Sequence, residues 1–179
     1  MQMKKILVTV VSDQTIPNVL FIKEMQGNAD GFLFISTIKM EDKQKTKAII
    51  EACGLTIEKT STVIVDQDSP FLVKHTIENW LNTFNDSTEF IVNLTGGNKT
   101  TTLVVFNVFS KKESNFFYIP IGSKWIVKLN DHFEETQIPL TVQLDLHTYL
   151  KANGLYFNSP DALIFTKAQT YQIFQSYKA

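Results

Sequence analysis

The sequence predicts an α/β fold: a Rossmann-like three-layer sandwich with a mainly parallel central sheet, a terminal β-hairpin and a short C-terminal helical extension. Three observations predict it. Apolar, strand-like segments alternate with amphipathic, helix-like ones, which is the pattern of a parallel sheet covered on both faces. The chain of 179 residues is 44% hydrophobic, which suits one domain with a full core. Polar residues follow the strand-like segments, where open parallel sheets bind their ligands.

Strand-helix units account for the first part of the chain. The strands are predicted over residues 4–11, 31–37, 60–66 and 89–94, and the helices that follow them over residues 16–26, 41–53, 70–84 and 98–111. Pro17 lies in the first turn of its helix, where its missing N–H costs little. Gly54 ends the second helix, and Asp68 or Ser69 caps the third.

The rest of the chain adds further strands and two helices. A fifth strand is predicted over residues 115–120, and a hairpin over residues 124–129 and 134–138 that turns at Asn130-Asp131. Two short helices follow, over residues 144–151 and 161–177. We therefore expect a Rossmann-like domain over residues 1–142 and a helical extension over residues 143–179, which serves as a dimer arm or as a connector to a further module.

Composition and charge exclude several classes of protein. A net charge of −1 and a pI near 6.3 give no bulk attraction to a long polyanion, so we expect no binding to duplex DNA. The single cysteine, Cys53, cannot form an internal disulfide, and the three histidines show no zinc-site spacing. We expect a cytoplasmic protein with no metal and no cofactor. The apolar run over residues 6–11 is too short to cross a membrane and indicates a buried strand.

Candidate ligand-binding residues follow the carboxyl ends of the first three strands. Because these ends meet at one edge of a parallel sheet, the side chains are expected to converge on a crevice there. The candidates are Ser12, Asp13, Gln14 and Asn18 after the first strand, Ser36 and Thr37 after the second, and Asp66 after the third.

The most informative segment is the turn after the fourth strand, Thr95-Gly96-Gly97-Asn98-Lys99-Thr100. Adjacent glycines let the backbone approach a ligand and aim N–H groups at an anion where a helix begins, with Lys99 and the threonine hydroxyls around it. The plainer alternative is a tight turn followed by a solvated lysine. A Walker-type nucleotide loop is excluded because its upstream glycine is absent. A dinucleotide-binding fingerprint is excluded because no glycine follows the first strand.

Two motifs together resemble a known family. Ser12-Asp13-Gln14 with Pro17-Asn18, and the segment Asn93 to Lys99, are similar to the motifs of CARF domains, the CRISPR-associated Rossmann folds of type III CRISPR effectors. The resemblance covers roughly residues 1–150. It implies a homodimer that binds cyclic tetra- or hexa-adenylate across its two-fold axis, with an effector module fused to it or acting beside it.

The resemblance also implies roles for single residues. Ser12 and Gln14 would contact ribose or phosphate, Asn18 would hold the loop or a base, and the turn from Thr95 to Thr100 would bind the phosphates. Thr37 and Asp66 would be secondary contacts. The sequence departs from the family at Asn98, where threonine is frequent, and this puts a side-chain contact there in question.

Three functions stay open at this stage. The first is a cyclic oligoadenylate sensor. The second is a stand-alone ring nuclease without a metal, in which a 2′-hydroxyl of the ligand attacks the adjacent phosphate, with Ser12 orienting the reacting oxygen and Lys99 offsetting charge. The third is a regulatory module that binds another nucleotide. Binding and slow cleavage need the same groups, so the sequence does not separate the first two.

Overall fold

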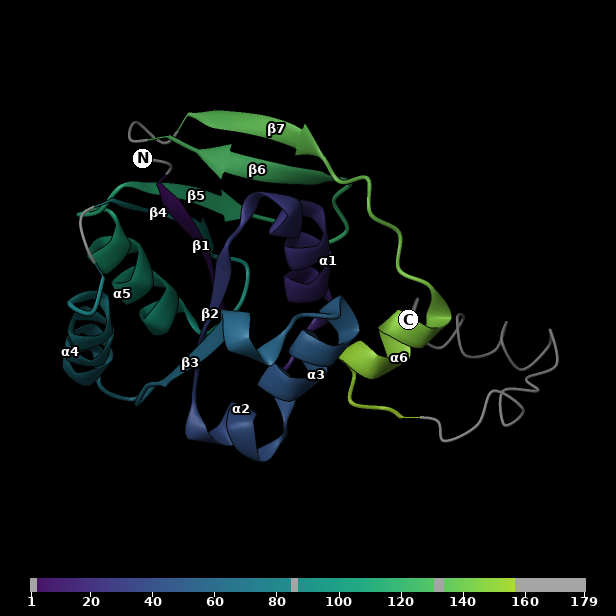
Figure 1. Cartoon of the computed structure of the whole chain (residues 1–179), viewed down its shortest axis with the longest axis horizontal. Coiled ribbons are helices and arrows are strands. Elements are labelled where there is room, and N and C mark those ends of the chain that lie inside the picture. Colours follow the sequence, from purple (N-terminus) through teal and green to yellow (C-terminus); the bar gives the residue numbers. More distant parts are fainter. Residues whose placement is uncertain (1–2, 85–86, 131–133, 157–179) are drawn as a thin grey trace, which may run out of the picture.

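The computed structural model of the protein describes residues 3–84, 87–130 and 134–156. Within them, strands form one sheet in the order β3-β2-β1-β4-β5-β6-β7, with helices on both faces (Figure 1). The strands are β1 (Lys4–Val10), β2 (Gly31–Ser36), β3 (Thr60–Ile64), β4 (Thr88–Asn93), β5 (Ser114–Tyr118), β6 (Trp125–Leu129) and β7 (Glu135–Pro139). Strands β1 to β5 are parallel, and β6 and β7 add an antiparallel hairpin. The predicted fold class is confirmed.

The helices cover the sheet from two sides. They are α1 (Ile16–Met25), α2 (Ile38–Asp42), α3 (Lys45–Cys53), α4 (Pro70–Leu81), α5 (Lys99–Phe109) and α6 (Leu146–Ala152), with 3-10 turns at Gln26–Asn28 and Ile57–Lys59. Ser69 caps α4 by accepting a hydrogen bond from the Leu72 amide, and Gly54 ends α3 in the left-handed conformation, as predicted. None of the described helices is long and apolar enough to span a membrane.

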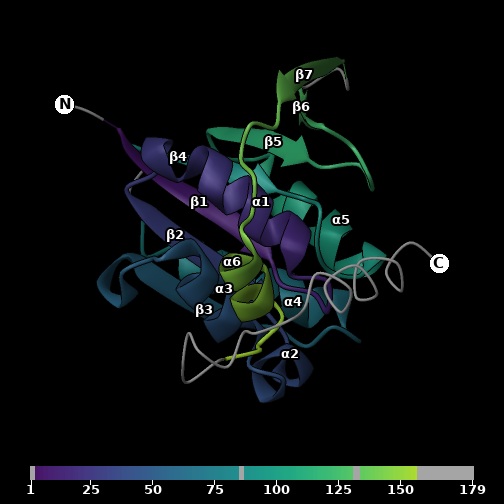
Figure 2. The ribbon, with the colours of Figure 1, turned by 90° about the vertical axis from the view of Figure 1, so that its right-hand side faces the viewer.

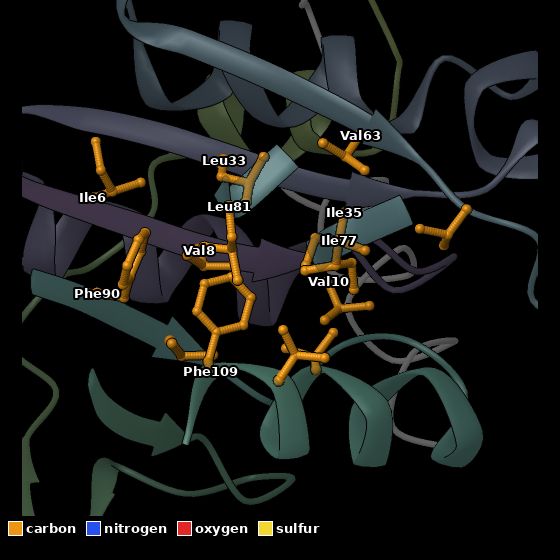
Figure 3. Packing of buried hydrophobic residues seen from close by; sticks show 14 of the residues in the cluster. Ile6, Val8, Val10, Leu33, Ile35, Val63, Ile77, Leu81, Phe90 and Phe109 are labelled. Atoms are coloured by element: carbon orange, nitrogen blue, oxygen red, sulfur yellow. The ribbon is translucent and has the colours of Figure 1, made fainter. Parts of the chain in front are cut away.

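Alternation along the strands sends side chains into two separate cores. On β1, Val8 and Val10 pack toward α4 and α5, whereas Leu7 packs toward α1 and α3. Figure 3 shows the first of these cores, where Phe90 and Phe109 meet edge to face with ring centroids 5.1 Å apart. Helix α1, which follows β1, and helix α5, which follows β4, therefore lie on opposite faces of the sheet.

The single helix predicted over residues 41–53 is wrong. The chain forms α2 and α3 instead, separated at Gln44, which adopts a positive φ of 53°. The Glu41 carboxylate accepts hydrogen bonds from the hydroxyls of Ser36 and Thr46. Residues five apart do not share a face of a continuous helix, so the break is what lets Glu41 and Thr46 meet.

A strap over residues 140–145 leads from the hairpin to α6, beside α3 (Figure 2). The Glu24 carboxylate of α1 accepts hydrogen bonds from the amides of Thr141 and Val142, both 2.8 Å, and from the Thr141 hydroxyl, 2.7 Å. The Thr15 hydroxyl donates to the carbonyl of Ala152, the last residue of α6. The first predicted C-terminal helix is thus present and packed on the domain, and the second, over residues 161–177, lies outside the described residues.

Candidate nucleotide-binding crevice

The crevice lies where the strand order reverses. Strands β1 and β4 are neighbours, with Thr9 opposite Asn93. The helices that follow them, α1 and α5, lie on opposite faces of the sheet. Loop 11–15 after β1 and turn 94–98 after β4 consequently diverge from the same edge. Open α/β sheets bind ligands at such a switch point, so the sequence motifs meet where a ligand is expected.

The glycine turn lies directly against the end of β1. A Cβ atom at Gly96 would stand 1.9 Å from the Val10 carbonyl oxygen, and one at Gly97 would stand 2.4 Å from Val10 Cγ1. Gly97 also has a positive φ of 81°. Both glycines are therefore required by the close approach of the turn to β1, whatever ligand the turn receives.

A buried amide network holds the loops in place. Asn93 Nδ2 donates to Thr9 Oγ1 at 3.1 Å and to Asn18 Oδ1 at 3.3 Å, and Asn18 Nδ2 donates to the Val10 carbonyl at 3.0 Å. Asn93 Oδ1 accepts from the amide and the hydroxyl of Thr95. The loops after β1 and β4 are thus joined beneath the crevice by side chains that water does not reach.

Asn98 begins α5 and caps it. Its side-chain oxygen accepts a hydrogen bond from the Thr101 amide at 2.7 Å. A helix leaves its first amides without intrahelical acceptors, so those of Lys99 and Thr100, in an exposed first turn, are open to a ligand. The Thr101 hydroxyl is buried and has no hydrogen-bond partner within the described part of the chain.

Two hollows flank the turn. The larger, of about 590 Å³, lies toward α1 and β5, and the smaller, of about 220 Å³, lies toward α2. Ser12 lines both. The larger is lined by Ser12, Gln14, Ile16, Pro17, Leu20, Leu94, Thr95 and residues 118–123. The smaller is lined by Val10, Val11, Ser12, Asp13, Ile35, Thr37, Lys39, Met40, Val65, Gln67, Gly97, Asn98 and Thr101.

The loop after β1 forms the wall between them. The Ser12 hydroxyl donates to the Gln14 carbonyl at 3.1 Å. Asp13 forms an ion pair with Lys43 at 2.6 Å, and this hydrogen bond lowers the pKa of the Asp13 carboxyl. Asp13 is therefore committed to the turn between α2 and α3, while the Gln14 side chain remains exposed beside the larger hollow.

Residues 6–149 match the family model described as the Card1 CARF domain. The chain belongs to this CARF family. The match covers both motifs of the crevice and extends into α6. No curated protein sequence matches the chain.

Solved structures share the fold of this CARF domain. Can2 from Sulfobacillus thermosulfidooxidans, in complex with cyclic tetra-adenylate, aligns with a TM-score of 0.71 at 20% identity and covers 97% of this chain. Protein VC1899 from Vibrio cholerae aligns with a TM-score of 0.72 at 16% identity, also over 97% of this chain. The alignments cover 48% and 45% of those two proteins, so this chain spans about half the length of each.

Some predicted site residues of the CARF domain lie away from the crevice surface. Asn18 is fully buried and holds the end of β1. Ser36 is also fully buried, with its hydroxyl bonded to Glu41. Asp66 accepts from the Asp68 amide at 3.1 Å and lines a separate hollow of about 780 Å³ between α2 and α4. The structure does not bring Ser36 and Asp66 together with the glycine turn, whereas Asn18 lies beneath it, with Nδ2 3.2 Å from the position of a Cβ atom at Gly96.

Other predicted residues stay at the crevice in altered settings. Thr37 caps α2 and lines both the smaller hollow and the one that holds Asp66. The Thr95 hydroxyl donates to Asn93 and accepts from the Ile119 amide at 2.9 Å. Lys99 is exposed in the first turn of α5 and lines neither hollow.

The loop after β5 is a wall of the larger hollow that the sequence interpretation missed. Residues 118–123 contribute Ile121, which is 99% exposed, and Gly122, with a positive φ of 72°. Because β5 is parallel to β4, its carboxyl end belongs to the same edge, and that rule could have found the loop. Lys39 and Met40, from α2, line the smaller hollow. They were missed because no helix was predicted over these residues.

The described residues hold no cluster of His, Cys, Asp or Glu that could bind a metal ion. Cys53 is buried in the core around α1 and α3, and burial raises the pKa of its thiol to about 12. A thiol in this setting packs as a small apolar group.

Proposed function

We propose that this CARF domain binds a cyclic oligoadenylate, cyclic tetra- or hexa-adenylate, as the sensor of a type III CRISPR antiviral effector. The observation that carries the proposal is the meeting of loop 12–14 and turn 95–98 at the switch point of a chain that belongs to the CARF family. The fold it shares with Can2, whose structure contains cyclic tetra-adenylate, supports the same ligand class.

The first turn of α5 suits a phosphate. Its free amides, at Lys99 and Thr100, carry the positive end of the helix dipole, and the Lys99 ammonium adds a full charge above them. Asn98 provides the cap that keeps these donors aligned. The phosphates of the ring are accordingly assigned to the turn from Gly97 to Thr100. The Ser12 hydroxyl, which donates its proton to the Gln14 carbonyl, is assigned to an adjoining ribose hydroxyl, from which it can accept.

A two-fold ligand fits a two-fold protein. In this proposal, two copies of the chain present their crevices to opposite halves of one ring, which gives an isologous interface. An effector, either fused to the chain or separate from it, responds to the bound ring. The segment over residues 143–179 serves as the dimer arm or the connector to that effector.

The decisive experiment mixes the protein with cyclic tetra-adenylate and cyclic hexa-adenylate and measures heat of binding, with linear tetra-adenylate as the reference. We expect at least one ring to bind more tightly than the linear form. Lys99→Ala should weaken binding about tenfold because a phosphate contact is lost, and Lys111→Ala, just beyond the opposite end of α5, should change it little. Failure of both rings to bind would overturn the proposal.

The same samples are then separated by chromatography to detect linear products. An intact ring supports the sensor. Linear product would move the assignment to a ring nuclease, with Ser12 and Lys99 as the groups to test first. In that case Ser12→Ala should reduce cleavage more than binding.

A further inference from the structure

The larger hollow beside the glycine turn has an uncharged lining. Its walls are built by Ile16, Leu20, Leu94, Ile119 and other apolar groups, and no charged side chain stands among the described residues that line it. Phosphates are matched by the amides and the ammonium of α5 and not by such a surface. A flat, neutral heterocycle with an apolar face matches it well, and about 590 Å³ is within the usual range for small-molecule sites.

The polar side chains of this hollow are nearly all committed to the protein. The Thr95 hydroxyl donates to Asn93 and accepts from Ile119, and the Ser12 hydroxyl donates to the Gln14 carbonyl. The Ser123 hydroxyl bonds the backbone of Trp125 in both directions. The Tyr118 hydroxyl donates to Glu135 at 3.2 Å.

Gln14 is the exception. Within the described part of the chain its side-chain amide makes no hydrogen bond, although it is exposed at the rim of the hollow. A glutamine amide offers one N–H donor beside one carbonyl acceptor. Adenine presents the complementary pair at N7 and N6, whereas guanine and hypoxanthine present two acceptors, N7 and O6.

We propose that the larger hollow receives an adenine base of the ring and that Gln14 is the residue that selects adenine, through paired hydrogen bonds to N6 and N7. This rests on the proposed function, and it moves Gln14 from the ring's backbone, where the family resemblance put it, to the base. Ile121, nearly fully exposed on the loop after β5, then covers the outer face of the base.

The test compares cyclic tetra-adenylate with the analogue in which every adenine is replaced by hypoxanthine. The unaltered protein should bind the adenine ring at least about tenfold more tightly, because hypoxanthine replaces a donor by an acceptor. Gln14→Ala should weaken binding of the adenine ring and bring the ratio of the two affinities close to one. Gln14→Glu, which removes the donor at constant size, should also weaken binding of the adenine ring, but it should keep the preference for adenine, because a carboxylate still accepts from N6 and is repelled by O6 of hypoxanthine. Both variants change an exposed residue and should keep the melting temperature.

Two further glutamine variants serve as controls. Gln137→Ala, on the edge strand β7, should leave affinity and ratio unchanged. Gln67 lines the smaller hollow, so Gln67→Ala should also keep the preference for the adenine ring. Loss of that preference in Gln67→Ala, or an unchanged preference in Gln14→Ala, would overturn the assignment of the base. The proposed function would stand in either case. If the unaltered protein binds neither ring, the proposed function fails first and the inference fails with it.

Discussion

Asn93 is the residue on which the shape of the crevice depends. Its side chain is fully buried at the end of β4, and its amide joins Thr9, Asn18 and Thr95, which belong to β1, α1 and the glycine turn. A buried amide costs free energy unless its hydrogen bonds are made, and here both its oxygen and its nitrogen are used. The same bonds that satisfy Asn93 set the distance between the two loops of the crevice.

Asn93→Ala should therefore lower the free energy of unfolding by about 2–3 kcal/mol, because Asn18 and Thr95 lose buried partners. Urea denaturation followed by circular dichroism measures this loss. Asn79→Ala, an exposed position on α4, should stay within about 0.5 kcal/mol of the unaltered protein. Equal losses in the two variants would show that the network contributes nothing particular to stability.

The position of the crevice could be predicted from the sequence, but not which of its polar side chains are bonded within the protein. Gly96 and Gly97 signal a close backbone approach, and the structure shows that the partner approached is Val10. Asn18 and Ser36 have the polar side chains expected of site residues, yet both are hydrogen-bonded inside the protein. Residue type and spacing predict where polar groups gather, whereas which of them remain unpaired depends on packing between segments far apart in the chain.

At the scale of elements, α1 connects the crevice to the C-terminal part of the described chain. Thr15, which directly precedes it, bonds the end of α6 through its hydroxyl, and Glu24 within it bonds the strap. Burial acts to raise the pKa of Glu24, and three hydrogen bonds outweigh it, so the pKa lies below the ordinary value of 4.5. The ionised carboxylate is thus the form that binds the strap.

Glu24→Gln should destabilise the protein by about 1–2 kcal/mol at neutral pH, because charge-assisted hydrogen bonds to Thr141 and Val142 become weaker. A group with a lowered folded pKa contributes its stability fully above the unfolded value and loses it as pH falls through the folded value. The difference between Glu24→Gln and the unaltered protein should therefore shrink below about pH 4.5. Thermal melts from pH 3 to pH 8 measure it.

Glu58→Gln, at an exposed position before β3, is the matched control and should show no such pH-dependent difference. A destabilisation by Glu24→Gln that is the same at every pH would contradict the assignment of the carboxylate as the group that holds the strap.

The break between α2 and α3 shows what local patterns miss at this scale. Residues 41–53 contain neither glycine nor proline, so periodicity favours one helix. The left-handed turn at Gln44 is stabilised by hydrogen bonds to Glu41 from Ser36, which lies outside the segment at the end of β2, and from Thr46 within it. A non-glycine residue at positive φ is uncommon, and tertiary hydrogen bonds select it here. The helix ends marked by local caps, at Ser69 and Gly54, were found from the sequence.

At the scale of the whole molecule, alternation of strand and helix sufficed for the fold class but not for the order of the strands. The reversal between β1 and β4, which creates the crevice, follows from packing α1 and α5 on opposite faces, and no local signal specifies it. The hairpin β6-β7 was recognised by its alternating pattern, and it extends the sheet beyond β5 and away from the crevice.

The proposed homodimer makes a prediction at this scale. Large apolar side chains are exposed near the carboxyl edge of the sheet, among them Phe71 on α4, 74% exposed, and Leu103 on α5, 69% exposed and one turn beyond Lys99. Exposed apolar groups beside a ligand site are suited to an interface that closes around the ligand. We expect one ring of cyclic tetra-adenylate to bind per two chains, as measured by calorimetry and light scattering.

Leu103→Glu should lower both the dimer fraction and the affinity for the ring, because a charge at the two-fold interface is desolvated when the copies meet. Ile57→Glu is the control: Ile57 is 76% exposed but precedes β3, at the opposite edge of the sheet, and its replacement should leave both quantities unchanged. One ring bound per chain, with the same dimer fraction and affinity in Leu103→Glu as in the unaltered protein, would show that each crevice binds a ring alone. That result would reject the two-fold arrangement, although the site at the switch point would stand.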